Sequence, residues 1–252
     1  MMSDLVQTAN LAWSEYCVRH ARAGVVLALV GSGLLPVVGS GPASAASRWE
    51  KIAVWHMDET SGTRMRDSVG NNHGKLHFVR LGRVGFKGGA YGFNGTSSYV
   101  DVPNADVFNF GVSSVRVTVH IRTSVLGHST AGDDLIKKGY YASSPGLFKM
   151  ELYPDGKVSC AFKGPKGYTG DIFSRSSVVT LPPATPVYHT VRCVLDQARK
   201  QAAVVVDGVA EGTRRADVGS ITSRDPVLIG AYPGTGFYNG VLDEVMIEVR
   251  RP

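Results

Sequence analysis

The sequence lacks the local motifs that large classes of hydrolases carry. Neither a Gly-x-Ser-x-Gly elbow nor a His-Glu-x-x-His pair occurs in the 252 residues, and these motifs supply a serine nucleophile and a pair of zinc ligands. The glycine-rich stretch 85–95 precedes no helical pattern, so it does not predict a phosphate-binding loop. Helical periodicity is missing after residue 46 as well. The sequence therefore argues against these enzyme classes and against a helical fold.

A long apolar run is also missing, and this excludes a membrane-spanning helix. The main apolar stretch, residues 23–38, holds about 16 residues and is broken by glycines and Pro36, whereas a spanning helix needs about 20. Arg19 and Arg22 precede it and small residues follow it, which is the pattern of a secretory signal peptide. We expect residues 1–46 to be a cleaved leader whose start codon lies downstream of Met1.

The predicted mature protein is therefore a single extracellular domain, residues 47–252, that is secreted and has no membrane span. The basic excess of this protein is modest. The chain has 27 Lys and Arg against 21 Asp and Glu, and two residues of each sign lie in the leader, so a net charge of +6 remains after cleavage. The basic residues are scattered along the predicted elements, and no nucleic-acid-binding motif accompanies them. A net charge of this size is explained by the need for solubility, and the alternative is that it attracts acidic polysaccharides. We expect no nucleic-acid partner.

Cysteine is scarce. Of three cysteines, Cys17 lies in the leader, so only Cys160 and Cys193 belong to the predicted domain. Apolar residues alternate along 157–163 and 187–195, and this alternation places each cysteine on the apolar face of a predicted strand. Two inward-facing thiols in an oxidising compartment predict a disulfide, with two free buried thiols as the alternative.

Glycine is abundant, with 30 residues, and it separates short segments typical of β-strands. Residues 114–123 alternate between apolar and polar side chains, which predicts one buried and one solvated face. About a dozen such segments in about 206 residues predict an all-β fold, a two-sheet antiparallel β-sandwich. Two hairpins are expected, one turning at Pro154-Asp155-Gly156 and one at the polar tip 196–200. The remaining predicted strands cover 52–57, 74–79, 89–94, 98–102, 147–153, 157–163, 187–195, 202–207, 226–231 and 240–249.

The order of several short motifs resembles the laminin G-like domains of the concanavalin A-like lectin and glucanase family. The resemblance spans residues 49–250 and implies a jelly roll of two facing sheets. The paired cysteines are similar to those of secreted actinobacterial members. The motifs are WHMDETSG at 55–62, DS at 67–68, GGAYGFNG at 88–95, YVDV at 99–102, YHTV at 188–191, VVVDG at 204–208, LIG at 228–230 and FYNGVLDEV at 237–245.

The resemblance leaves the function open, because this fold hosts carbohydrate binding, adhesion, glycoside hydrolysis and lyase chemistry. Hydrolysis needs two carboxylates close together. The candidates Glu244 and Glu248 would lie about 13 Å apart along a strand, which is too far for either glycosidase geometry. The alternative is that both side chains belong to a solvated outer face of the sheet. We therefore predict a non-catalytic module that binds a glycan or an extracellular protein. A concanavalin A-like glycosidase or polysaccharide lyase, and a structural matrix or envelope-associated domain, are the alternatives.

Aromatic residues in predicted loops are the candidate ligand contacts, because a partly exposed ring can stack on a sugar. The alternative role of each ring is to close an end of the sandwich. The candidates are Tyr140, Tyr141, Tyr168, Tyr232, Phe237 and Tyr238.

Asp243 is the carboxylate that the strand pattern places most unusually. Strict alternation puts it on the same face as Val245, toward the interior, where an unpaired charge is costly. The family resemblance implies a structural Ca²⁺ near a sheet edge, held by carboxylate and backbone oxygens. Asp58, Asp67 and Asn94 are the candidate partners of Asp243 in such a site. The alternative is that Asp243 accepts hydrogen bonds from backbone amides or an arginine.

Overall fold

A computed structural model describes residues 48–182, 184–232 and 234–252, and nearly all regular structure in them is β-strand. A short 3-10 turn, η2 (Asp106–Phe108), is the helical element of this part. The predicted signal peptide, residues 1–46, lies outside the described residues. In the part that is described, no helix has the length and hydrophobicity needed to span a bilayer.

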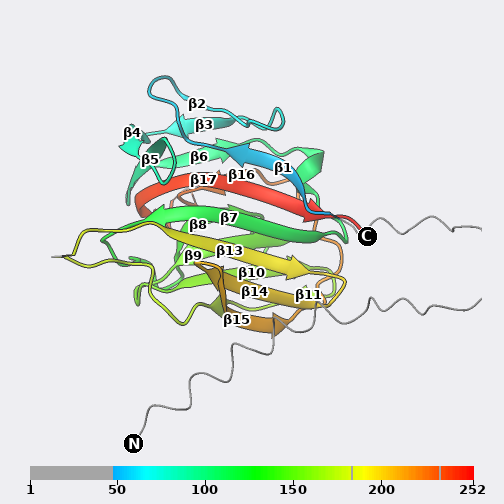
Figure 1. The fold of residues 1–252 in the computed structure, drawn as a ribbon. Coiled ribbons are helices and arrows are strands. Elements are labelled where there is room, and N and C mark those ends of the chain that lie inside the picture. Colours follow the sequence, from blue (N-terminus) through cyan, green and yellow to red (C-terminus); the bar gives the residue numbers. More distant parts are fainter. Residues whose placement is uncertain (1–47, 183, 233) are drawn as a thin grey trace, which may run out of the picture. The chain divides into compact units, whose positions relative to one another are not determined.

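Eight strands form sheet A, and all of its strand pairs are antiparallel (Figure 1). The long β17 pairs with β7 on one side, and with β5 and then β1 along its other side. In order across the sheet, the strands are β15 (Val209–Arg215), β14 (Gln201–Val206), β13 (His189–Asp196), β7 (Ser114–Arg122), β17 (Asn239–Arg250), β5 (Gly89–Asn94) and β4 (Arg80–Val84), with β1 (Glu50–Trp55) beside β17.

Nine strands form sheet B, which is antiparallel as well. The strands are β11 (Gly167–Tyr168), β10 (Val158–Gly164), β9 (Leu147–Leu152), β8 (Asp133–Lys138), β16 (Val227–Ile229), β6 (Tyr99–Val102), β3 (Gly74–His77) and β2 (Arg64–Met65), with β12 (Ile172–Phe173) also beside β10. The late strand β16 lies between the consecutive strands β8–β11 and the early strands β6, β3 and β2, so the chain returns to this sheet after crossing to the other one.

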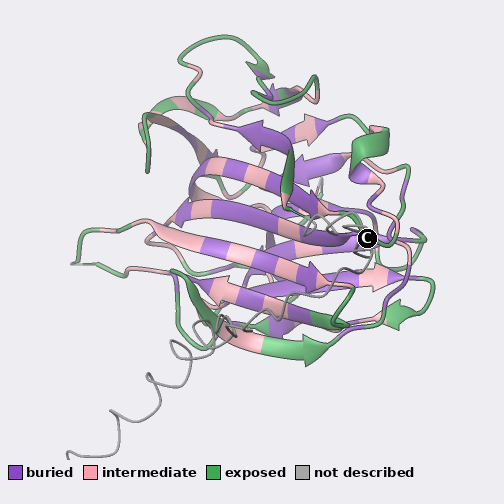
Figure 2. Ribbon diagram, turned by 45° about the vertical axis from the view of Figure 1, so that its right-hand side comes forward, coloured by how far each residue is buried: buried purple, intermediate pink, exposed green. Residues whose placement is uncertain are grey.

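The core fills the space between the two sheets. Alternate residues of β7, from Val115 to Ile121, are fully buried and belong to one apolar cluster with Phe148 and Met150 of β9. Buried and half-buried residues alternate along the strands of sheet A, as Figure 2 shows. This confirms the predicted two-sheet antiparallel sandwich. Burial of each such side chain contributes about 1.5–3 kcal/mol to folding.

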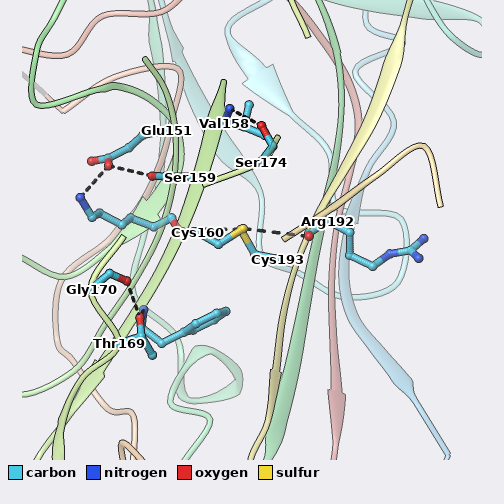
Figure 3. Close-up of a disulfide and its surroundings, with 11 residues drawn as sticks. Glu151, Val158, Ser159, Cys160, Thr169, Gly170, Ser174, Arg192 and Cys193 are labelled. Atoms are coloured by element: carbon cyan, nitrogen blue, oxygen red, sulfur yellow. Dashed lines mark hydrogen bonds and ion pairs between the residues drawn. A yellow bond between two sulfur atoms is a disulfide. The ribbon is translucent and has the colours of Figure 1, made fainter. Parts of the chain in front are cut away.

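The predicted disulfide is present and joins the two sheets. Cys160 of β10 and Cys193 of β13 are bonded with their Cα atoms 5.5 Å apart, and both side chains are buried in the core (Figure 3). Both predicted hairpins are present too, as β9 with β10 and β13 with β14. The alternation that placed the cysteines inward was therefore correct.

A β-bulge in β17 overturns the predicted orientation of Asp243. The register with β7 shifts between Asp243 and Met246, and Glu244 in the bulge has φ of 45°. Asp243 is opposite His120 on the outer face of sheet A, whereas Val245 points into the core. The predicted shared face of Asp243 and Val245 is therefore wrong, because one extra residue inverts the side-chain alternation.

Several strands were missed by the sequence prediction. The longer ones are β4, β8 and β15, and the two-residue strands β2, β11 and β12 were missed as well. In β8, the run Asp-Asp-Leu-Ile-Lys-Lys does not alternate, because the register with β9 shifts between Asp134 and Ile136. β4 and β15 are mostly exposed and lack an apolar face.

Candidate ligand-binding groove

The outer face of sheet B carries a group of charged side chains. Lys137 of β8 is opposite Lys149 of β9, and Asp134 is opposite Glu151. Because directly opposed residues of an antiparallel pair project from the same face, the four side chains lie together. An open cavity of about 450 Å³ lies over them. We call this cavity the tyrosine groove, and the lining residues used below are Lys137, Tyr141, Lys149, Glu151, Tyr153, Tyr168 and Asp171.

Lys149 is the centre of the ion pairs in the groove. Its Nζ lies 2.6 Å from Glu151 Oε2 and 3.0 Å from Asp171 Oδ1. Burial alone would lower the pKa of Lys149, but its bonds to these two carboxylates outweigh burial and raise the pKa above its ordinary value. Tyr153 donates its hydroxyl proton to Glu151 and Tyr168 donates to Asp171. The charges are thus fixed in place before any ligand binds.

Asp134 lies beside the groove, and its carboxyl group is buried. Its side chain is 4% exposed, and Oδ2 is 3.4 Å from Lys137 Nζ. Oδ1 is buried and has no hydrogen-bond partner among the described residues. Burial raises the pKa of Asp134 to about 7, although Lys137 partly opposes this rise. Burial likewise raises the pKa of Glu151, with Lys149 opposing it. The two neighbouring carboxyl groups are therefore easier to protonate than ordinary acidic side chains.

Four of the predicted aromatic candidates lie around the groove. The rings of Tyr141 and Tyr168 meet edge to face with centroids 5.0 Å apart, and Tyr141 is 63% exposed. Tyr232 lies under Lys137, whose Nζ is 4.7 Å from the ring centroid, and Tyr140 packs against Tyr232 at 5.1 Å. The structure thus brings Tyr140, Tyr141, Tyr168 and Tyr232 to the same end of sheet B.

The other two aromatic candidates are not part of the groove. Tyr238 is fully buried, and its ring lies 6.0 Å from that of Phe93 in the core. Its assignment as a ligand contact is therefore wrong, and closing the sandwich is its role. Phe237 is half-buried and does not line the groove.

The four predicted calcium ligands do not come together. Asp67 accepts hydrogen bonds from the backbone of Val54, and Asn94 binds the amides of its own turn. Asp58 accepts from Gly89 N, and Asp243 accepts from the amides of the β4–β5 turn and from Glu244 N. Within the described ranges, no group of three or more His, Cys, Asp or Glu is placed to hold a metal. The geometry of Asp243 matches the alternative of hydrogen bonds from backbone amides.

Glu244 and Glu248 are not the solvated pair that the sequence predicted. Glu248 accepts two hydrogen bonds from Arg116, at 2.6 and 2.7 Å, and its side chain is 6% exposed. Glu244 is paired with His56 Nδ1 at 2.9 Å. Each carboxylate thus has a partner of its own, and the expected exposed acidic face is corrected to an Arg116–Glu248 ion pair and a separate hydrogen bond between His56 and Glu244.

The charged residues of the groove were missed by the sequence prediction. Lys149 and Glu151 occupy the polar positions of the predicted strand 147–153, so their common face could have been found from alternation. Asp134 could not be placed, because β8 was not predicted and the register shift lies next to Asp134.

Comparison with solved structures shows the same fold in proteins of low sequence identity. The binding domain of Paraclostridial Mosquitocidal Protein 1 has 15% identity and a TM-score of 0.63, with 80% of this chain and 49% of that chain covered. The botulinum neurotoxin serotype G binding domain has 11% identity and a TM-score of 0.62, covering 81% and 48%. This chain therefore spans about half the length of these two toxin domains.

Domain 4 of AbnA, a GH43 extracellular arabinanase from Geobacillus stearothermophilus solved in complex with arabinotriose, has 16% identity and a TM-score of 0.59. The match covers 80% of this chain and 93% of that domain. No curated protein sequence matches the chain. A family model matches residues 94–250, more than half of the sequence. The chain belongs to the concanavalin A-like lectin/glucanases superfamily.

Proposed function

We propose that this protein is a secreted module that binds a carbohydrate chain in the tyrosine groove. The observation that carries the proposal is the position of two partly exposed rings, Tyr141 and Tyr168, beside the ion pairs of Lys149. A sugar offers an apolar C–H face to an aromatic ring and hydroxyl groups to charged side chains. The groove presents both kinds of partner within one open cavity.

The charges of the groove favour a neutral sugar over a strongly charged ligand. Lys137 and Lys149 are matched by Asp134, Glu151 and Asp171, so the groove has little net charge when Asp134 is protonated. Sugar hydroxyls both donate and accept hydrogen bonds, and they can therefore bind carboxylates and lysines at the same time. The open shape suits a chain that extends beyond the cavity, and the arabinotriose complex of the similar AbnA domain supports this reading.

A glycan array followed by calorimetric titration with the strongest hit tests the proposal. We expect Tyr141→Ala to weaken binding at least tenfold, because the substitution removes the exposed ring. Phe78→Ala is the matched control, since Phe78 is 79% exposed and lies outside the groove. Loss of binding in both variants, or in neither, would contradict the proposal. A protein that binds no glycan at all would fit the structural alternative.

Glycoside hydrolysis is a second candidate, favoured by the register of Asp134 and Glu151. Directly opposed residues project side by side from one face, so the two carboxyl groups are neighbours, as the pair of carboxyl groups in a retaining glycosidase must be. The raised pKa of Asp134, about 7, suits a proton donor. Release of reducing ends from the bound polysaccharide, abolished by Asp134→Asn, would establish it. Binding without release of products would leave the module non-catalytic.

A further inference from the structure

The outer face of sheet A carries two half-buried arginines, Arg192 and Arg122, that form no ion pair within the described residues. Arg192 of β13 is half-buried, and its Nε donates to Thr118 Oγ1 at 3.2 Å. Among the described residues no carboxylate lies within ion-pair distance of Arg192, whereas the nearby Arg116 is fully paired with Glu248. A guanidinium presents five N–H donors, so most donors of Arg192 have no protein partner there.

Arg122 is in a similar position at the other end of the same face. It is half-buried, its Nη2 donates to the carbonyl of Val84 at 3.2 Å, and its guanidinium lies 4.9 Å over the ring of Tyr188. It too has no carboxylate partner in the described part of the chain. Arg192 is opposite Thr118, four residues before Arg122 on β7, so the backbone positions of the two arginines are about 13 Å apart along the strand direction.

An exposed aromatic ring lies between the two arginines. Phe86 is 55% exposed, and one face of its ring stacks on His120 at a centroid distance of 4.1 Å. His120 is opposite Thr190, midway between Tyr188 and Arg192. The ring of Phe86 also meets that of Tyr188 nearly at right angles, with centroids 6.0 Å apart. The exposed part of the Phe86 ring lies above the strands, where a sugar ring can stack on it.

The β4–β5 turn holds Phe86 in this position. Gly85 N donates to Gly88 O, and the buried Asp243 accepts a hydrogen bond from Lys87 N at 3.0 Å. A Cβ on Gly85 would come within 2.0 Å of Gly89 O, so the tight turn requires glycine there. The bulge at Glu244 places Asp243 under the turn. The tight turn and the buried carboxylate thus hold Phe86 beside His120 at the surface of sheet A.

We infer that the outer face of sheet A is a second binding site, and that it takes an acidic sugar chain. Arg192 and Arg122 would bind carboxylate or sulfate groups of the chain, and Phe86 would stack on a sugar ring between them. Arginine suits this role because its planar donors match such anions. Because the two arginines start from backbone positions about 13 Å apart, a chain of several sugars that extends across the face can contact both of them.

The two proposed sites lie on opposite faces of the sandwich. Figure 3 shows the disulfide between the sheets, with Glu151 on one side and the guanidinium of Arg192 on the other. The arginine face is therefore independent of the tyrosine groove. A molecule with both sites could hold a neutral and an acidic chain at once.

Binding of three polymers to the full chain tests the inference: polygalacturonate, dextran sulfate and uncharged dextran. We expect one or both acidic polymers to bind and dextran not to bind this face. Arg192→Gln and Arg122→Gln should each weaken acidic-polymer binding at least tenfold. Arg66→Gln removes the same charge from an exposed position elsewhere, and it should change binding less than twofold. The preferred polymer identifies the anion as carboxylate or sulfate.

Equal losses in the Arg66 and Arg192 variants would overturn the inference, because they would show attraction to net charge alone. Absence of binding to both acidic polymers would overturn it as well. Tyr141→Ala should leave acidic-polymer binding unchanged, so failure of the groove proposal is distinguishable from failure of this one. If Arg192→Gln unfolds, Phe86→Ala provides the decisive variant, because an exposed ring can be removed without loss of core packing. Unchanged binding of the acidic polymers to Phe86→Ala would contradict the stacking role of Phe86.

Discussion

At the scale of single residues, Asp134 makes the stability of the protein depend on pH. Burial raises its pKa to about 7 from an ordinary value of 3.8, so the folded protein keeps a proton that the unfolded chain has already released. Stability from this group is complete below about pH 4 and is lost as the pH rises through 7. The loss is at most about 4 kcal/mol.

Asp134→Asn should remove that dependence, because asparagine stays neutral. Relative to the unmodified protein, the variant should gain free energy of unfolding between about pH 4 and 7 and show a constant difference above that range. Urea denaturation of both proteins at pH 4, 5.5 and 7.5 measures the difference. The attraction of Lys137 for ionised Asp134 is already included in the pKa of Asp134, so a difference that does not vary with pH would contradict the assignment.

Single residues also show what sequence reasoning cannot place. Tyr141 and Tyr238 both follow loop-like patterns, yet one is 63% exposed and the other is fully buried. A tyrosine has an apolar ring and a polar hydroxyl, so it fits both a surface and a core position. The distinction depends on contacts between distant segments, such as that of Tyr238 with Phe93, which no local pattern contains.

At the scale of elements, the bulge in β17 determines which face of sheet A receives Asp243. Glu244 has φ of 45° there, a conformation that glycine tolerates and a β-branched residue does not. Glu244→Gly and Glu244→Val both remove the hydrogen bond with His56, so the difference between them reports on the backbone. We expect the valine variant to be less stable than the glycine variant by about 1–2 kcal/mol.

Met246 supplies the matched control for this comparison, because it lies just after the bulge in regular pairing with Thr118. At this position the order should reverse, and Met246→Val should be more stable than Met246→Gly. Thermal or chemical unfolding of the four variants checks both statements. The same order at both positions would show that the positive φ of Glu244 is not important for folding.

Elements differed in how well their sequence predicted them. β7 alternates strictly and has one buried face, so its existence and orientation were both predictable. β8 interrupts its alternation with a register shift, and β17 contains a bulge after three residues of regular pairing with β7. Both irregularities depend on the partner strand, which local alternation does not reveal. For this reason Asp243 was placed on the wrong face and Asp134 was missed, although most strands were predicted correctly.

At the scale of the whole molecule, the two-sheet architecture and its disulfide followed from apolar alternation, since every inward face must be covered by another sheet. The function of the outer faces did not follow from this alternation. Their use depends on which charged residues the register makes neighbours, as it does for Glu151 with Asp134 and for Arg192 with Thr118. The sequence therefore predicted the core of the protein better than its two candidate binding faces.

The bond between Cys160 and Cys193 is the covalent link between those two faces, and its contribution can be measured. It closes a loop across 33 positions, which in the chain-entropy model stabilises the fold by about 3–4 kcal/mol. Cys160→Ala/Cys193→Ala should lose about that much free energy of unfolding in urea, and reduction of the unmodified protein should have a comparable effect. Because strands on either side supply the packing, we expect both forms to remain folded with the sheets intact. A loss below about 1 kcal/mol would show that packing alone already holds the sheets together and that the cross-link hardly restricts the unfolded chain.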